Sequence, residues 1–517
     1  MNKKWEYYKI DNNKINEISE KHKISKLLAQ VILNRGIVEN VDIFFKPTRE
    51  DFYDPFLMTD MEKAVERIIK AINQKEQIVI FGDYDVDGIT STTVLKKFLE
   101  DIGVQAKYTI PNRLSEGYGL HKETLKTIKD EGGNLVITVD CGITAIEEVA
   151  FANSIGLDVI ITDHHEPIDE LPNALAIVNA KRKDSIYPFR NLAGVGTVFK
   201  LIQALTKRLG LPDKLFLQYL DIVAVGTISD IVPLVDENRV ITKLGLKLLN
   251  ETRNIGLKEL IKMLGFETLN SYSVAFAIAP RINACGRLGH EKEAVNLFLT
   301  DSEEEAKAIT LKLSQYNTKR QAIEKDIFED AIQKIEKEDL KNKNSIILWD
   351  ENWNHGVIGI VASRITEKFS KPTILIACED GIGKGSGRSI PCFDLHEALN
   401  KTSKYLEQYG GHALAIGLSI KQENLEKFKN AFEEYANTKE VKEYIPTIKI
   451  DAEITAKDIN INSVDEIKKL EPFGESNKMP IFIYNNVKIN SIRTLSEGRH
   501  LKLSLCDGST FVDAIRI

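Results

Sequence analysis

The chain has 517 residues, of which 43% are hydrophobic and 28% charged, and its formal net charge is −7. This length predicts two to four domains, each with its own core. No apolar run is long enough to cross a bilayer, and the N-terminus lacks the apolar stretch of a signal peptide. The acidic balance excludes binding of a polyanion through overall charge, so such a partner would need a local basic surface or a metal.

Five cysteines are scattered along the chain, and none is spaced as C-x-x-C. The odd number and the wide spacing favour a reducing compartment and exclude a zinc ribbon. We therefore expect a cytoplasmic protein.

Residues 1–75 predict a helical N-terminal segment, because apolar residues recur there at helical spacing and Pro47 and Pro55 precede a further helix near 60–73. From residue 77 short apolar strands alternate with helices, which is typical of a parallel, doubly wound α/β sheet. Four strands are predicted, at 78–81, 135–139, 158–162 and 175–178.

Acidic and imidazole side chains follow the first three of these strands. They are Asp83, Asp85, Asp87, Asp140, Asp163, His164 and His165. Because the C-terminal ends of parallel strands meet at one edge of a sheet, we expect these side chains to converge.

Asp83, Asp85 and Asp87 alternate in a loop between a strand and a helix, and three charges this close repel one another unless a cation lies among them. An EF-hand loop also begins D-x-D-x-D-G, but it needs a glutamate at position twelve, where Val94 stands, and a preceding helix. A helix N-cap would explain any single aspartate but explains the whole set poorly.

Asp230 offers a further carboxylate, in a segment (224–233) that we expect to form a turn between two helices. Carboxylates with one or two imidazoles suit Mn²⁺ or Mg²⁺, and the imidazole favours Mn²⁺. So many ligands predict two ions, which is an arrangement suited to phosphoryl transfer.

Two basic segments lie where a phosphate would need them. Residues 281–287 are expected to place Arg281 and Arg287 around a glycine turn. The glycine-rich segment 381–388 offers the Gly385–Gly387 amides, the Ser386 hydroxyl and the Arg388 guanidinium. Neither segment matches a Walker A loop. Taken alone, residues 381–388 predict a hairpin, and the alternative role for Arg388 is a surface ion pair.

Residues 302–337 predict one long helix, capped by Asp301 or Ser302, of the kind that joins two domains. A second α/β unit begins at Ser345, and from about 445 alternating strands indicate a small β-barrel. The last residues lie in mid-strand, so we expect the natural sequence to continue beyond Ile517.

Four motifs together resemble those of the DHH phosphoesterase superfamily. They are Asp85-Val86-Asp87-Gly88, Asp140-Cys141-Gly142, Asp163-His164-His165 and Gly226-Thr227-Ile228-Ser229-Asp230. Gly410-Gly411-His412 resembles the signature of the DHH-associated domain. Within the superfamily, residues 75–517 are most similar to the RecJ family of single-strand-specific 5′→3′ exodeoxyribonucleases.

The resemblance implies a parallel-sheet α/β DHH domain, a long helix, a smaller α/β DHH-associated domain and an OB-like β-barrel. The implied divisions are a helical N-terminal segment at 1–75, the catalytic domain at 76–300, the connecting helix at 301–340, the substrate-binding domain at 341–440 and an incomplete OB-like DNA-binding domain at 445–517.

The same resemblance implies roles for individual residues. Asp85, Asp87, Asp140, His164 and Asp230 would hold two Mn²⁺ or Mg²⁺ ions, with Asp140 bridging them and Asp83 either contributing or shaping the loop. His165 would face the scissile phosphate and Asp163 would orient the imidazoles, so these two and Asp140 form the implied catalytic group. The implied phosphate-binding residues are Arg113, Asn283, Arg287, Ser386, Arg388 and His412, with Arg113 at the narrow end of a channel.

The implied function is the hydrolysis of single-stranded DNA from its 5′ end to mononucleotides, in DNA repair and recombination, by a monomer. A RecQ-type helicase and a single-strand-binding protein are the implied partners. A DHH phosphodiesterase acting on short oligoribonucleotides or cyclic dinucleotides is an alternative, which the long first-domain insert and the barrel disfavour. A non-catalytic DHH scaffold in a replication complex is a second alternative, which the full set of ligand aspartates disfavours.

Overall fold

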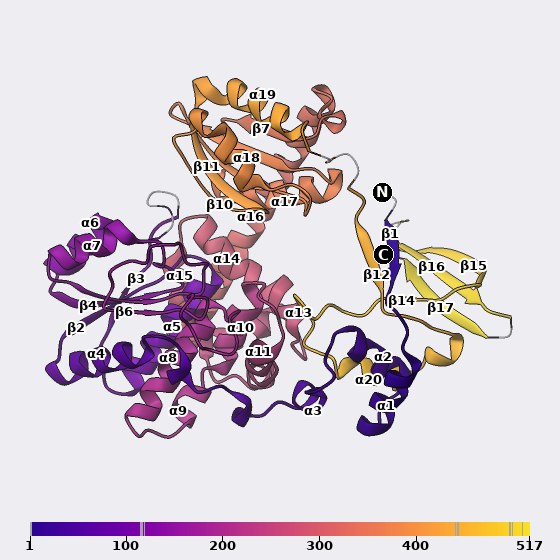
Figure 1. The fold of residues 1–517 in the computed structure, drawn as a ribbon, viewed down its shortest axis with the longest axis horizontal. Helices are drawn as coiled ribbons and strands as arrows, with labels where there is room; N and C mark the ends of the chain where they lie inside the picture. The colour runs from indigo at the N-terminus through magenta and orange to yellow at the C-terminus, as the bar shows by residue number, and fades with distance from the viewer. Residues whose placement is uncertain are drawn as a thin grey trace.

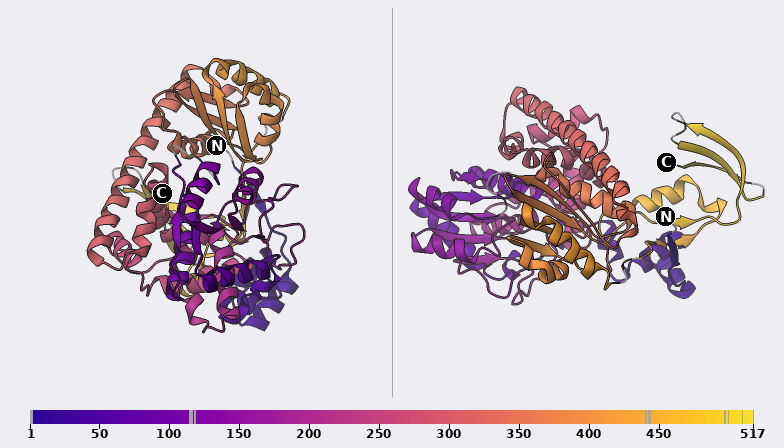
Figure 2. Two further views of the ribbon diagram at one scale, coloured as in Figure 1. Left: turned by 90° about the vertical axis from the view of Figure 1, so that its left-hand side faces the viewer. Right: turned by 90° about the horizontal axis from the view of Figure 1, so that it is seen from above.

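The computed structural model describes residues 3–113, 117, 119–439, 441, 444–495, 498, 500–508 and 510–516. Figure 1 shows two α/β units joined by a long helix, with the N-terminal and C-terminal segments side by side next to them. The two further views in Figure 2 show the second α/β unit lying over the first. Among the described residues, no helix combines the length and the apolar character needed to span a membrane.

The first unit is built on the predicted parallel sheet, whose strand order is β3-β2-β4-β5-β6. The strands are β2 (Gln77–Phe81), β3 (Lys107–Thr109), β4 (Gly133–Val139), β5 (Asp158–Thr162) and β6 (Ala176–Val178). Every neighbouring pair is parallel. Strand β3 was not predicted, because a three-residue edge strand with a Lys-Tyr-Thr sequence carries no apolar signal.

Helices cover both faces of this sheet. On one side α4 (Met61–Gln74), α5 (Val86–Asp101) and α8 (Gly194–Arg208) pack on Ile78, Ile80 and Ile137. On the other side α6 (Lys122–Asp130) and α7 (Ile146–Ser154) pack on the alternate residues, such as Val79 and Val136. Because both faces are buried, the strands are continuously apolar up to the edge where the polar residues begin.

A set of helices completes the first unit: α9 (Lys214–Leu217), α10 (Leu220–Ser229), α11 (Asp236–Leu249), α12 (Ile255–Leu264), α13 (Ser271–Ser273), the π-helix η3 (Val274–Ile278), α14 (Ala279–Arg287) and α15 (Glu291–Leu299). Two predicted turns differ from the structure: the one at 224–233 is limited to the residues after Ser229, and the one around Gly286 is helical. Residues 224–229 continue helix α10, because residues 220–228 are buried all round, and only Asp230 lies at its C-terminal end.

Gly286 does not form a turn but lies in the last turn of α14. A Cβ atom at this position would lie 2.3 Å from the carbonyl oxygen of Tyr84, so glycine is required for close approach of the helix to the loop that carries Asp83 and Asp85.

The predicted long helix is α16 (Glu303–Lys337), and Ser302 Oγ caps it by accepting a hydrogen bond from the Glu305 N–H at 3.3 Å. Its first turns add Ile309 and Leu313 to the core of the first unit, and its last turns add Ile327 and others to a second core. The helix therefore fixes the distance between the two α/β units.

The second unit contains a mixed sheet with the order β10-β11-β9-β8-β7. The strands are β7 (Ile346–Asp350), β8 (Thr373–Glu379), β9 (Ile382–Arg388), β10 (Gln408–His412) and β11 (Ala415–Lys421). Helix α17 (His355–Phe369) packs on one face, and α18 (Leu395–Thr402) and α19 (Leu425–Ala436) pack on the other.

Residues 382–388 of the glycine-rich segment form β9, the central strand of this sheet, which makes the expected hairpin with β8 and is not a phosphate-binding loop. A Cβ atom at Gly383, Gly385 or Gly387 would lie 2.6–2.8 Å from the side chains of Ile376, Leu418 and Ile416. The glycines therefore make room for large apolar neighbours. Because β9 is paired on both sides, its amides belong to the sheet ladders, and the expectation that the Gly385–Gly387 amides bind a phosphate is wrong.

The N-terminal segment is not purely helical, since β1 (Lys4–Tyr7) pairs in parallel with β12 (Thr447–Ile450). Beside them lie α1 (Asn12–His22), α2 (Lys26–Asn34), α3 (Val41–Phe45), β13 (Ala452–Glu453), α20 (Ile461–Lys468) and β14 (Phe482–Ile483). Leu470 completes the small core formed by these N-terminal helices. The antiparallel strands β15 (Lys488–Leu495), β16 (His500–Cys506) and β17 (Phe511–Arg516) follow. Short 3-10 helices lie at Arg49–Asp51, Pro55–Leu57, Leu340–Asn342, Ser403–Tyr405, Gln422–Asn424 and Ala456–Asp458.

Arg239 of α11 joins the N-terminal segment, the first unit and the connector, which is the segment 469–479 between α20 and β14. It is buried, its guanidinium lies 3.4 Å from the ring centroid of Phe44, and it donates to the carbonyls of Phe44, Leu470 and Glu471. Burial lowers the pKa of Arg239 to about 9, with a further contribution from the charge of Arg35. These backbone acceptors compensate for the buried charge.

A truncation test follows from this contact. A chain ending after Pro446 loses the connector carbonyls and Leu470. We expect its free energy of unfolding to fall by about 1–3 kcal/mol for the unsatisfied Arg239 donors alone. We also expect early proteolysis of the first 46 residues. A chain ending after Asn486 keeps both and should melt as the full chain does in calorimetry. Equal melting of the two truncated chains would contradict this role of the connector.

Candidate metal centre and phosphate-binding cleft

Side chains from three strand ends and one helix end meet at the C-terminal edge of the parallel sheet. Potential ligand atoms lie within 4.8 Å of one another in each of three groups: Asp83, Asp85 and Asp140; Asp87, His164 and Asp230; and Asp140, His164 and His165. Asp140 therefore belongs to two groups that together include five of the seven side chains of this cluster. The tertiary structure brings together every residue that was expected to bind metal.

Asp85 and Asp87 are held by helix N-termini. Asp85 caps α5 by accepting from the Gly88 N–H at 3.1 Å. The two oxygens of Asp87 accept from the N–H groups of Gly194 and Val195, at 2.6 and 2.8 Å, at the start of α8. Burial, followed by the charge of Asp85, raises the pKa of Asp87 to about 7.

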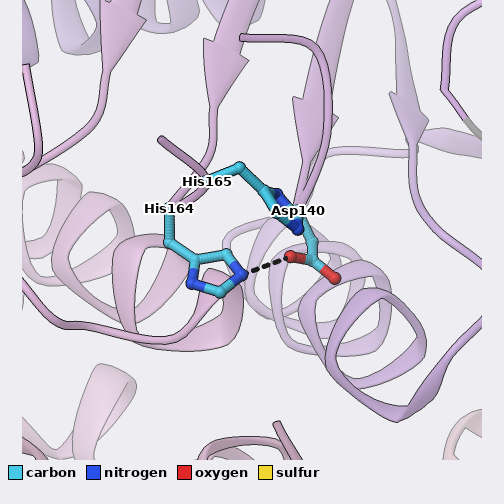
Figure 3. A group of neighbouring side chains, drawn as sticks. All are labelled: Asp140, His164 and His165. Carbon is cyan, nitrogen blue, oxygen red and sulfur yellow. Dashed lines mark ion pairs between the residues drawn. The ribbon is translucent and has the colours of Figure 1, made fainter. Parts of the chain in front are cut away.

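Asp140 has a left-handed backbone with φ of 62°. Its N–H donates to the Thr162 carbonyl at 3.0 Å, which fixes the turn after β4. Non-glycine residues rarely adopt this conformation, and such strain gathers at functional sites. The turn aims the carboxylate at the neighbouring strand end, where Asp140 Oδ1 lies 3.1 Å from His164 Nε2 (Figure 3).

Asp163 is fully buried and orients the two histidines. Its Oδ1 accepts from the backbone N–H of His164 and of His165 at 2.7 and 3.1 Å, and lies 2.7 Å from His165 Nδ1. Its Oδ2 accepts from the Ile143 N–H at 2.9 Å. With both oxygens engaged in this way, Asp163 is placed to act through the histidines.

The two histidines differ in charge. Burial, and then the charge of His165, lowers the pKa of His164 to about 3, so its imidazole is neutral and available as a ligand. For His165 burial opposes the charged form, but the hydrogen bond and charge of Asp163, with Asp83 and Asp85 nearby, raise its pKa to about 9. His165 is therefore an imidazolium at neutral pH, with a side chain that is 39% exposed.

The donor set fits divalent cations. Burial and mutual repulsion raise the pKa of Asp83, Asp140 and Asp230 well above the usual range. Asp83 Oδ1, Asp230 Oδ2 and both ring nitrogens of His164 are buried without a hydrogen-bond partner among the described residues. Carboxylate oxygens with an imidazole are ligands for Mn²⁺ or Mg²⁺, and a bound cation would relieve this repulsion.

Gly194, Val195 and Asn179 were missed by the sequence analysis. Asn179 follows β6 and donates from its side chain to the His165 carbonyl at 2.9 Å. The start of α8 has the sequence Ala-Gly-Val-Gly, and two glycines at a helix N-terminus are a recognisable signal for a bound anion. Here the anion is the protein's own Asp87 carboxylate.

Gly194 allows α8 to approach the metal cluster. A Cβ atom there would lie 2.5 Å from Asp140 Oδ1. We therefore expect Gly194→Ala to reduce metal affinity by about 10- to 100-fold, the usual effect of losing a residue that orients the metal ligands. The far-UV circular dichroism spectrum of the variant should remain that of the folded chain. Metal titration by calorimetry measures this. Gly196→Ala is the control, because its Cβ would meet only Leu192, at 3.4 Å; equal affinities of the two variants would contradict the steric argument.

Three arginines from both α/β units lie beside the metal cluster. The guanidinium of Arg113 lies 4.9 Å from the ring centroid of Tyr84. Arg287 ends α14 and donates to the Gly356 carbonyl of α17 at 2.9 Å, which ties the two units together. Burial, then the charges of Arg113, Arg320 and Arg388, lowers the pKa of Arg287 to about 9. This concentration of positive charge is suited to a phosphate.

Arg388 and Ser386 project from β9 towards α17. Arg388 Nη1 donates to Ser386 Oγ at 3.1 Å and to the Gly387 carbonyl at 2.7 Å. Burial and the charge of Arg113 lower the pKa of Arg388, and no carboxylate among the described residues forms an ion pair with it. The alternative of a surface ion pair is therefore wrong.

His412 and Asn283 lie at two sides of these arginines. Ala415 is paired with Arg388 on one side and with His412 on the other, so His412 and Arg388 lie in one row across the sheet and on the same face. His412 is exposed. Asn283 lies one turn before Arg287 on α14 and lines the same pocket.

A parallel α/β sheet that ends in a carboxylate-imidazole cluster, faced by arginines from a second α/β unit, defines a metal-dependent phosphoesterase. Family models agree with this class. They match the DHH family N-terminal domain at residues 77–227, the DHHA1 domain at 342–438 and the RecJ OB domain at 450–516.

Curated relatives and solved structures narrow the class. The single-stranded-DNA-specific exonuclease RecJ of Bacillus subtilis is 39% identical over 99% of this chain, which spans 65% of that relative's length. The protein of the same name from Salmonella typhimurium is 33% identical over 89% of this chain and 83% of its own. The Mn²⁺ complex of RecJ from Thermus thermophilus has a TM-score of 0.87 at 31% identity, covering 99% of this chain and 74% of that one. The chain belongs to the RecJ family.

Proposed function

We propose that this chain is a metal-dependent exonuclease that hydrolyses single-stranded DNA. The proposal rests mainly on two groups of potential metal ligands that share Asp140. Three arginines lie beside these groups: Arg113, Arg287 and Arg388. Such a site needs a substrate with several phosphates, and the RecJ relatives supply the substrate class by name. Family structures in complex with Mn²⁺ and with Mg²⁺ support the same choice of cofactor.

Asp85, Asp87, Asp140, His164 and Asp230 would hold two Mn²⁺ or Mg²⁺ ions, with Asp83 completing the group around Asp140. Two bound ions activate a water molecule and stabilise the attacking and leaving oxygens of a phosphodiester. The chain's own residues arrange this chemistry. The α8 N-terminus fixes Asp87, and Asp163 fixes both histidines.

His165 would contact the scissile phosphate as an imidazolium. Its Nδ1 is held by Asp163, and the His165 side chain is partly exposed. Arg388 with Ser386 would bind a terminal 5′-phosphate, and Arg287 with Asn283 would bind the next phosphates. His412, in the row of Arg388, would meet the end of the strand. Arg113 would narrow the cleft, so that a single strand enters and a duplex does not.

The direction of degradation, 5′→3′ to mononucleotides, follows if the terminal phosphate occupies the Arg388 pocket. Because the substrate is a single strand, a RecQ-type helicase that exposes it and a single-strand-binding protein are proposed partners, in repair and recombination. A cytoplasmic location is proposed from the five cysteines, all of which are free thiols.

One assay tests the proposal. Single strands labelled at the 5′ or the 3′ end, a blunt duplex and a short RNA are incubated with Mn²⁺, Mg²⁺ or EDTA. We expect 5′-labelled mononucleotides to appear first from the single DNA strand, in either metal, and no product in EDTA. Faster cleavage of short RNA than of long DNA would instead favour the oligoribonucleotide phosphodiesterase.

A further inference from the structure

A pocket of about 640 Å³ lies directly beside the metal cluster, and the proposed function does not yet use it. Its walls come from the end of α10, from α13, η3 and α14, from α16 and α17, and from the connector at 471–479. Asn283 and Arg287 lie on one wall, and the residues on either side of Asp230 lie on another. The pocket therefore continues the cleft in which a strand would be cut.

Large apolar side chains are exposed at the rim of this pocket. Ile231, Tyr272, Phe276 and Met479 are 66–71% exposed. Soluble proteins expose clustered apolar groups of this size mainly where a ligand or partner binds. The charged residues of the lining are Arg287 and Arg320 on the helical walls, and Glu471, Glu475 and Lys478 on the connector. An apolar rim next to the arginine wall matches a ligand with flat apolar groups on an anionic chain.

Tyr272 and Phe276 form the aromatic part of the rim. Their ring centroids lie 4.5 Å apart with an interplanar angle of 34°. Tyr272 lies in α13 between the buried Ser271 and Ser273, and Phe276 lies in the π-helix η3, whose Val274 and Ile278 are buried, so both rings point away from the core. A π-turn within helical structure is uncommon and frequently marks a functional site.

Ile231 follows the candidate ligand Asp230 and has a left-handed backbone with φ of 62°. A β-branched residue in this conformation is strained, and its side chain is 71% exposed instead of buried. The strain places an apolar group at the pocket, one residue from the metal cluster. It is a second, independent feature that marks this wall as a binding surface.

We propose that this pocket is a base-stacking site, in which Tyr272 and Phe276 stack against bases of the single strand that extends from the metal centre. The inference rests on the proposed function and adds to it a contact with bases, whereas the arginine cluster contacts phosphates. Aromatic rings bind bases of any sequence, because every base has a π face. The site thus holds an unpaired strand in register for cleavage without sequence preference, and paired bases cannot enter it.

The test compares strands with and without bases. Binding of a 5′-phosphorylated single strand and of an abasic strand of equal length is measured by fluorescence anisotropy in EDTA, where cleavage does not occur. We expect Tyr272→Ala/Phe276→Ala to weaken binding of the normal strand by about 5- to 100-fold, the range for one lost stacking contact. Binding of the abasic strand should stay within about twofold.

Two control variants separate stacking from a structural effect. Tyr272→Phe/Phe276→Tyr keeps both rings and should bind as the original chain does. Ile186→Ala removes an exposed apolar side chain (75%) that lies outside the pocket and should also bind normally. Fluorescence of a 2-aminopurine base in the strand gives a direct readout, since stacking on a ring quenches it.

The outcomes are distinct. An equal loss of affinity for the normal and abasic strands, or no loss for either, overturns the stacking site. If the unaltered chain neither binds nor cleaves single strands, the proposed function fails, whatever the variants do. If it cleaves them while the alanine variant binds them unchanged, only the stacking inference fails.

Discussion

Asp140→Asn should abolish metal-dependent cleavage while leaving the protein folded. Asp140 is the one side chain shared by the Asp83–Asp85 group and the His164–His165 group, so its replacement removes charge from the place where the two proposed ion positions would meet. Metal stabilisation of the transition state amounts to several kcal/mol, which predicts a fall of about a thousandfold or more in kcat. The measurement is the initial rate of mononucleotide release in Mn²⁺.

The fold should tolerate this change for two reasons. Asparagine has the shape of aspartate and adopts the left-handed backbone of position 140 readily. The amide also removes one charge from a crowded, buried cluster, so the metal-free variant should melt at the same or a higher temperature. Asp169→Asn, at a fully exposed carboxylate of the same unit, is the matched control. Near-normal turnover of Asp140→Asn in Mn²⁺ would falsify the two-ion site.

Arg388→Ala should slow the cleavage of 5′-phosphorylated single strands far more than that of 5′-hydroxyl strands. Arg388 is half-buried, its charge is close to that of Arg113, and it has no ion-pair partner among the described carboxylates, so it is placed to bind an anion. A hydrogen bond to a charged group contributes about 1.5–3 kcal/mol, which predicts a loss of about 10- to 100-fold in kcat/KM for the phosphorylated strand. The ratio of the two kcat/KM values is the quantity to measure.

The controls use the surroundings of Arg388. Ser386→Ala removes a hydroxyl that accepts from Arg388 and should give a smaller change in the same direction. Lys427→Ala removes an exposed cation on α19, the opposite side of the sheet, and should leave the ratio unchanged. If Arg388→Ala slows both strands by the same factor, Arg388 does not recognise the 5′ end.

The family and the main chemistry were accessible from the sequence because they depend on local patterns. Apolar runs that end in Asp83, Asp140 or Asp163 place each acidic group at a strand end, and a parallel sheet collects such ends at one edge. The long helix was equally clear, since the Ser302 cap and the regular apolar spacing are both local features.

Where side-chain packing decided the outcome, the sequence pattern misled. The glycines of β9 suggested backbone amides that bind a phosphate, but they are required because Ile376, Ile416 and Leu418 occupy the space next to them. Residues 224–229 predict a turn, but burial on all sides by neighbouring helices keeps them helical. In both cases the free energy of burying large apolar groups outweighs the local conformational preference of the residues.

The sequence by itself determined which residues can bind metal and phosphate, because ligand chemistry is a property of the side chain. The tertiary structure decided which of them cooperate. It brought Arg287 close enough to Arg388 for their charges to interact, through the contact of α14 with α17, and it tied Asp87 to a helix that starts 107 residues later in the chain. It also exposed Tyr272 and Phe276 at the pocket rim. Contacts between distant segments depend on the packing of whole units, which no local pattern encodes.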